Sequence, residues 1–138
     1  MSDERCPDLS VKRRPTGTRV DKVDIAGKLS QFAEPWVPRI VGELNGQHVK
    51  VAKMRGVFDW HHHENEDEMF LVMKGSFRME FRDYSVELRQ GEMLVVPRGV
   101  EHRPVADKEC HVLLCEPVST RNTGNVKTDR TVEDLERI

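Results

Sequence analysis

The chain has 138 residues and a mass of 16.0 kDa, which is enough for one compact domain with its own buried core. A net charge of -2 and a pI near 6.3 argue against nucleic acid and membranes as partners and favour a small molecule or another protein. The apolar runs are too short to span a bilayer, and residues 1–17 contain no apolar secretory segment. We therefore expect a cytoplasmic protein.

The N-terminal part of the chain predicts an arm followed by a helix. Residues 1–19 are polar, basic and interrupted by proline, which is typical of a flexible arm. Within residues 20–37, Asp24 can cap a short helix in which Ile25, Leu29 and Phe32 share one face. We expect this helix to pack on the outside of the main body.

Residues 38–118 predict a β-domain. Apolar and polar side chains alternate in "SFRMEFRDYSVEL", the pattern of a hairpin with one buried face. Further strands are expected at "RIVGEL", "QHVKVAKM", "EMFLVMK", "EMLVVP", "HRPVA" and "CHVLLCE", separated by turns that contain glycine. Many short strands with no helices between them indicate an antiparallel sandwich or barrel.

Several of these strands are apolar at consecutive positions, as in "MFLVM", "MLVV" and "VLLC". Both of their faces must then be covered, one by the barrel core and the other by the flanking helix or by a second subunit. A homodimer is therefore expected. The C-terminal extension, residues 119–138, is polar, and Thr131 with Asp134 predicts a short helix near its end.

Three consecutive histidines stand in "WHHHENEDEMFLVMKG". In an extended chain His61 and His63 point to one face and His62 to the other. Glu68 begins the next expected strand and can return a carboxylate to the same place. His102, after the strand and turn "GEMLVVPRGVEH", is a candidate fourth ligand from a distant part of the sheet.

These segments resemble the two sequence motifs of the cupins. "GVFDWHHHENEDEMFLVMKG" is similar to the first motif, and "GEMLVVPRGVEHRPVA" is similar to the second. The resemblance covers residues 38–118. It implies an all-β fold, a double-stranded β-helix or jelly-roll barrel, with short terminal helices outside it. It also implies one divalent metal inside the barrel, with open coordination positions, bound by His61, His63, Glu68 and His102.

Three further residues are candidates for the wall of the substrate pocket. Phe70 follows Glu68 in strand phase and would form an apolar wall. Lys53 shares the phase of Val49 and Val51, so it points into the cavity or lies at an exposed edge. His111 begins an apolar strand whose phase the sequence leaves open.

A site of imidazole and carboxylate ligands accepts Fe, Mn, Ni, Cu or Zn, and the sequence does not select among them. With open positions, such a metal supports an enzyme acting on a small molecule, either a dioxygenase or an isomerase or epimerase. The alternative is a non-catalytic cupin that binds or senses a metabolite or the metal itself. The sequence shows no recognisable general base beyond the ligands, so no catalytic group is assigned. The fold does not separate these functions, because one fold hosts many of them.

Overall fold

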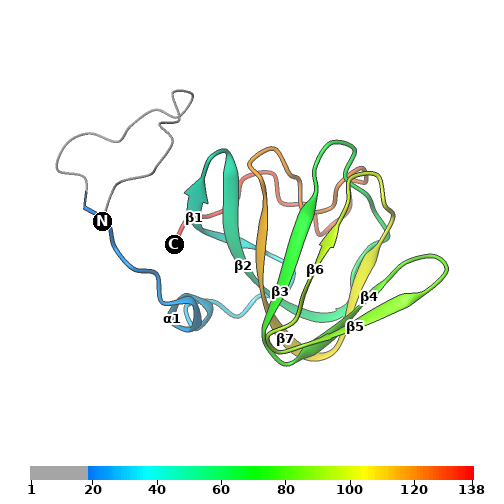
Figure 1. Cartoon of the computed structure of the whole chain (residues 1–138), viewed down its shortest axis with the longest axis horizontal. Helices are drawn as coiled ribbons and strands as arrows, with labels where there is room; N and C mark the ends of the chain where they lie inside the picture. The colour runs from blue at the N-terminus through cyan, green and yellow to red at the C-terminus, as the bar shows by residue number, and fades with distance from the viewer. Residues whose placement is uncertain (1–18) are drawn as a thin grey trace, which may run out of the picture.

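The structure is a computed structural model that describes residues 19–138 (Figure 1). The predicted arm therefore lies outside the described residues, apart from Arg19. Helix α1 (Ile25–Leu29) begins where the Asp24 carboxylate accepts a hydrogen bond from the Gly27 N–H, as the sequence predicts. It is shorter than expected, and it lies against strand β2 on the outside of the barrel. The described residues contain no helix with the length and apolarity needed to cross a bilayer.

Seven strands follow the helix, and every strand pair in the described chain is antiparallel. The strands are β1 (Arg39–Leu44), β2 (Gln47–Val57), β3 (Glu68–Lys74), β4 (Ser76–Glu80), β5 (Ser85–Arg89), β6 (Met93–Val96) and β7 (Arg103–Pro117). Five of them lie side by side in the order β1-β2-β7-β3-β6, and the β4-β5 hairpin joins through β7 (Figure 1). The predicted all-β jelly-roll architecture is confirmed.

Strand β7 pairs with three other strands, β2, β3 and β4. The sequence suggested two strands over this region, but residues 103–117 form a single strand of 15 residues. Its first part pairs with β4, while its second part lies between β2 and β3, so that Cys115 is paired with both Val49 and Met69. One long strand thus joins the hairpin to the main sheet, and its inward side chains line the interior.

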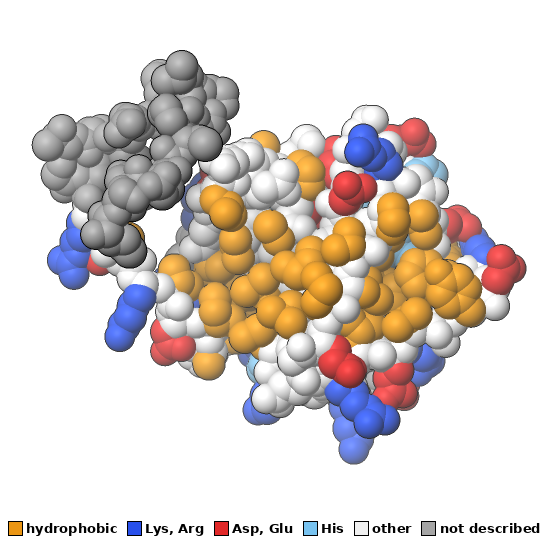
Figure 2. Space-filling view, viewed as in Figure 1, with side chains coloured by type: hydrophobic (Ala, Val, Ile, Leu, Met, Phe, Trp, Pro, Cys, Tyr) orange, Lys and Arg blue, Asp and Glu red, His pale blue; other side chains and the backbone are white. Residues whose placement is uncertain are grey.

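The outer face of the main sheet is largely apolar and uncovered in the single chain. Figure 2 shows a broad hydrophobic area over β2, β7, β3 and β6, with charged side chains around its edge. Met93 and Val95 are each 52% exposed, and Leu71 and Leu113 are half-buried. Helix α1 covers only the region of β2, so the homodimer expected from these strands stays a prediction.

The C-terminal extension differs from its prediction. Residues 119–138 form turns and bends and contain no helix. The Thr131 hydroxyl, expected to cap a helix, instead accepts a hydrogen bond from the Thr128 N–H and shares one with the Thr123 hydroxyl. Near the end of the chain, Arg137 forms a parallel bridge with Ile40 of β1. The local capping pattern is therefore overridden by pairing with the barrel.

Candidate metal centre

Backbone pairing brings His61 and His102 together from distant parts of the chain. The two residues form an isolated antiparallel bridge, in which each N–H donates to the other's carbonyl at 3.1 and 2.9 Å. Two residues further on, the His63 carbonyl accepts a hydrogen bond from the Gly99 N–H, which anchors the turn before His102. Glu68 stands at the start of β3, opposite Val96 of β6. Three separate segments thus converge on one point inside the barrel.

The four predicted ligands lie in one buried group. The exposed fractions are 3% for His61 and His63, 4% for Glu68 and 0% for His102. One possible ligand atom from each residue lies within 4.8 Å of the others. His62 points away, as strand alternation predicts, and its Nε2 lies 2.8 Å from the exposed carboxylate of Glu64. The geometry therefore separates the middle histidine from its two neighbours.

Two of the imidazoles are held in the tautomer that a metal ligand needs. His61 Nδ1 lies 2.8 Å from the Asp59 carbonyl oxygen, and His102 Nδ1 lies 2.8 Å from the Val100 carbonyl oxygen. A carbonyl only accepts hydrogen bonds, so each Nδ1 carries the hydrogen and each Nε2 keeps its lone pair. His63 Nδ1 has no comparable partner among residues 19–138.

The inward-facing atoms lack partners within the described chain. His63 Nε2 and His102 Nε2 lie 3.3 and 3.5 Å from Glu68 Oε1, yet none of these three buried atoms makes a well-formed hydrogen bond there. Buried polar atoms without partners are rare because desolvation costs about 1–3 kcal/mol for each. A divalent cation would satisfy all three atoms, and three imidazoles with one carboxylate suit a transition metal. The residues fit a metal ion, and the group could hold one.

The protonation states also suit a cation. Burial is the main cause that lowers the pKa of His61 to about 4, and the nearby His102 is the second. Burial by itself raises the pKa of Glu68, but polar contacts with His102 and His63 outweigh it and hold this pKa well below its ordinary value. At neutral pH, His61 is therefore a neutral imidazole and Glu68 a carboxylate, which are the forms that bind metals.

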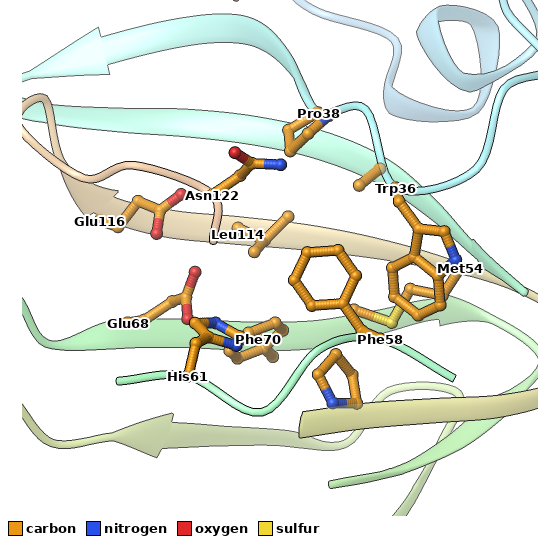
Figure 3. A pocket seen from close by; sticks show the side chains of 12 residues that line it. Trp36, Pro38, Met54, Phe58, His61, Glu68, Phe70, Leu114, Glu116 and Asn122 are labelled. Carbon is orange, nitrogen blue, oxygen red and sulfur yellow. The ribbon is translucent and has the colours of Figure 1, made fainter. Parts of the chain in front are cut away.

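A small cavity of about 40 Å³ adjoins His61 and Glu68. Figure 3 shows Glu68 and Glu116 near each other at one end and the rings of Trp36 and Phe58 at the other. Most of the wall is apolar; it is formed by Trp36, Pro38, Ala52, Met54, Phe58, Phe70, Pro104 and Leu114, with His61, Glu68, Glu116 and Asn122 as its polar members. Phe70 thus lies in the wall where the sequence predicted it.

Lys53 and His111, the other two candidates for the pocket wall, do not line this cavity. They are paired across β2 and β7 and share the outward face of the sheet. Lys53 Nζ donates a hydrogen bond to the Phe32 carbonyl at 2.6 Å, beneath the segment that follows α1. His111 Nε2 lies 2.9 Å from the Glu109 carboxylate. In β2, the side chains of the even-numbered residues, such as Ala52 and Met54, point into the barrel.

Lys50 is also even-numbered and points into the barrel, which the sequence interpretation missed. Lys50 is 1% exposed, and its Nζ forms an ion pair of 2.9 Å with Glu116, which is 2% exposed. Burial and the nearby Glu68 raise the pKa of Glu116 well above its ordinary value, although Lys50 opposes the shift. A signal was available, since Glu116 is in phase with the apolar Val112 and Leu114.

Comparison with known proteins places the chain in a family. The family model described as "Cupin domain" matches residues 47–115, which include both histidine motifs. The chain belongs to the cupin family. The family match begins with β2 and ends within β7, so β1, α1 and the C-terminal extension lie outside it.

Two solved structures and one curated protein are similar to this cupin. A cupin-2 domain containing protein from Shewanella frigidimarina NCIMB 400 is 42% identical with a TM-score of 0.68, covering 69% of this chain and 93% of that one. Protein NMB1881 from Neisseria meningitidis is 31% identical with a TM-score of 0.65, covering 70% of this chain and 99% of that one. YdbB of Bacillus subtilis (strain 168) is 36% identical over 64 residues, 46% of this chain, and the match spans 57% of its own length.

Proposed function

We propose that this cupin is a metal-dependent enzyme acting on a small molecule in the barrel cavity, of the dioxygenase class or the isomerase or epimerase class. The observation that supports the proposal is the buried convergence of His61, His63, Glu68 and His102 beside a largely apolar cavity. A metal bound there would act as a Lewis acid on a substrate carbonyl or, if it is iron, would bring oxygen and substrate together.

The cavity wall suggests what the protein itself contributes. Apolar side chains such as Phe58, Phe70 and Leu114 exclude water and would hold the carbon skeleton of a substrate. Glu116 is the polar group opposite the ligands, and its buried Oε2 has no hydrogen-bond partner among the described residues. A hydroxyl or N–H of a bound molecule would be able to donate a hydrogen bond to this oxygen. The proposed substrate is therefore small, mostly apolar and equipped with one donor group.

A second candidate function is non-catalytic binding or sensing of a metabolite or of the metal itself. The observation that favours it is the volume of about 40 Å³. A cavity needs roughly 10–15 Å³ measured in this way to hold one water molecule, so only a few heavy atoms fit beside the ligands. A metal ion or a very small ligand fits this volume as it stands, which suits a sensor.

The metal site is tested first, by elemental analysis of protein purified without oxygen. We expect about one divalent metal per chain, retained in His62→Ala and lost in both His61→Ala and His102→Ala. The loss of affinity should exceed about 100-fold, since even groups that only orient ligands account for 10- to 100-fold. Full occupancy in both ligand variants would contradict the assignment.

The reaction class is tested on the loaded protein. Oxygen uptake triggered by a substrate, with iron as the metal, would support a dioxygenase. Exchange of a carbon-bound proton with solvent, with a metal that does not change its oxidation state, would support an isomerase or epimerase. Tight binding of small carbonyl compounds without turnover in either assay would support the sensor.

A further inference from the structure

The segment that carries His61 is hydrogen-bonded to the rest of the barrel through its backbone at Phe58, His61 and His63. Residues 58–63 belong to no strand, although two of the four ligands come from this stretch. On the barrel side, its backbone is held by the bridge between His61 and His102, by the hydrogen bond from the Phe58 N–H to the Pro104 carbonyl and by that from the Gly99 N–H to the His63 carbonyl. Between Phe58 and His61, no backbone hydrogen bond to the barrel is found in the described chain, and the Trp60 ring lies against the guanidinium groups of Arg82 and Arg103.

The C-terminal extension supplies further contacts to this segment. Figure 1 shows the orange and red chain after β7 crossing one end of the barrel before it returns to β1. We call residues 119–132 the C-terminal strap. The strap follows the end of the cupin family match at residue 115, and its Asn122 forms part of the cavity wall.

The first contact of the strap is a backbone clamp on His62. The Asn125 N–H donates to the His62 carbonyl at 2.9 Å, and the His62 N–H donates to Asn125 Oδ1 at 2.8 Å. Gly124 makes this approach possible, because a Cβ at this position would collide with the His62 carbonyl and lie 3.1 Å from His61 Cδ2. The strap is thus packed directly against the residue next to a ligand and against the ligand ring itself.

The second contact passes through Asp59. Its side chain accepts a hydrogen bond of 2.8 Å from the Thr128 hydroxyl and forms an ion pair of 3.1 Å with Arg130 Nη1. Its backbone carbonyl is the acceptor for His61 Nδ1. Asp59 therefore joins two strap residues to the bond that sets the tautomer and ring direction of His61. Groups that fix a ligand in this way commonly account for about 10- to 100-fold in metal affinity.

We propose that the C-terminal strap is a positioning part of the metal centre. Asn125, Thr128 and Arg130 hold residues 59–62 so that His61 Nε2 points toward the other three ligands. The proposal rests on the proposed function, because it presupposes that the four residues bind a metal. It adds that the barrel alone gives an incomplete site, and that the strap completes the site without donating a ligand.

The test uses the full-length protein and measures the dissociation constant of Zn²⁺ by competition with a chromogenic chelator. The double variant Thr128→Val and Arg130→Gln removes both contacts to the Asp59 side chain, and Asn125→Ala removes one half of the clamp. We expect about 10-fold weaker binding or more in the double variant and a smaller loss in Asn125→Ala. When Arg130→Lys replaces Arg130→Gln in the double variant, the positive charge is kept, and part of the lost Zn²⁺ affinity should be recovered.

A second readout separates positioning from general stability. The absorption spectrum of the Co²⁺-loaded double variant should be shifted, because the His61 ring changes its direction. The matched control is Arg137→Gln, which removes a tail ion pair with Glu43 of 2.9 Å, away from residues 59–62. We expect this control to lower the Tm of the metal-free protein by a similar amount while leaving the Zn²⁺ affinity and the Co²⁺ spectrum unchanged.

The outcomes distinguish the two proposals. A wild-type protein that binds Zn²⁺ while the double variant and Asn125→Ala bind it within twofold of wild type would overturn the role of the strap alone. An equal loss in Arg137→Gln would also overturn it, because the effect would then be one of stability. A wild-type protein that binds neither Zn²⁺ nor Co²⁺ would overturn the proposed function and the role of the strap together.

Discussion

The barrel interior contains two buried carboxylates that are compensated in different ways. Glu116 forms an ion pair with Lys50, a cation supplied by the chain itself. Glu68 is surrounded by the imidazoles of His61, His63 and His102, and the nitrogens nearest to it lack hydrogen-bond partners among the described residues. A buried negative charge is stable only beside a positive partner. The comparison explains why Glu68 belongs to a candidate metal site, whereas Glu116 already has a cation supplied by the chain.

The largest effect should come from breaking the internal pair. Lys50→Met leaves Glu116 buried without its cation, and loss of one partner of a buried ion pair costs about 3–5 kcal/mol. Replacing both residues, as in Lys50→Met with Glu116→Leu, should restore most of the stability, because apolar pairs of similar volume replace buried ion pairs at little cost. Urea unfolding of the metal-free protein measures both values. Equal losses in the single and the double variant would show that Lys50 does not compensate Glu116.

A smaller loss in the free energy of unfolding should appear when His61 becomes protonated at low pH. The pKa of His61 is about 4 in the folded protein, against an ordinary value of 6.5. The folded state therefore binds fewer protons than the unfolded state between these values, so stability falls as the pH drops from 6.5 to 4. The loss amounts to roughly 3 kcal/mol, since each pKa unit corresponds to about 1.4 kcal/mol.

Urea unfolding of the metal-free protein at several pH values checks this prediction. His61→Asn removes the titrating group, so the variant should lose less stability over the same range. The difference between the two curves reports the loss of His61 together with its electrostatic effect on Glu68 and His102. Parallel curves for the variant and the wild type would mean that His61 titrates normally and is not desolvated.

The smallest effect should come from neutralising the internal pair while its shape is kept. In Lys50→Met with Glu116→Gln, both side chains keep nearly the same volume while the buried ion pair is removed. We expect the Zn²⁺ affinity to change by less than about tenfold, the lower limit for groups that orient a ligand. Competition with a chelator measures it. A loss beyond about 100-fold would place Glu116 among the ligands and remove the distinction between the two carboxylates.

The four residues of the candidate centre were predicted from local strand alternation together with the resemblance to the two cupin motifs. In any extended segment, His61 and His63 lie on one face and His62 on the other, whatever surrounds them. Glu68 follows after a short polar turn, and His102 follows a strand and a Pro-Arg-Gly turn. The hairpin of β4 and β5 was predictable for a similar reason, since Phe77 and Met79 alternate with polar neighbours.

The face of the sheet to which Lys50 and Lys53 point was decided only by the tertiary structure. Residues 50–54 of β2 are all buried, because the barrel core covers one face and the segment around α1 covers the other. Burial on both faces removes the alternation from which strand phase is read. The sequence therefore did not show that Lys50 points inward to Glu116, nor that Lys53 points outward to the Phe32 carbonyl.

The difference between local and long-range determinants also explains why the predicted helix of the C-terminal extension does not form. Short-range alternation in the sequence indicated an antiparallel sandwich or barrel, and the resemblance to the cupin motifs implied the jelly-roll fold and the ligand set. The path of residues 119–138 depends on partners far away in the chain, including Ile40, Asp59 and His62. A capping pattern around Thr131 stabilises a helix by about 1 kcal/mol, which several long-range hydrogen bonds outweigh. Only the folded barrel therefore decided that this tail would lie against the residues beside His61.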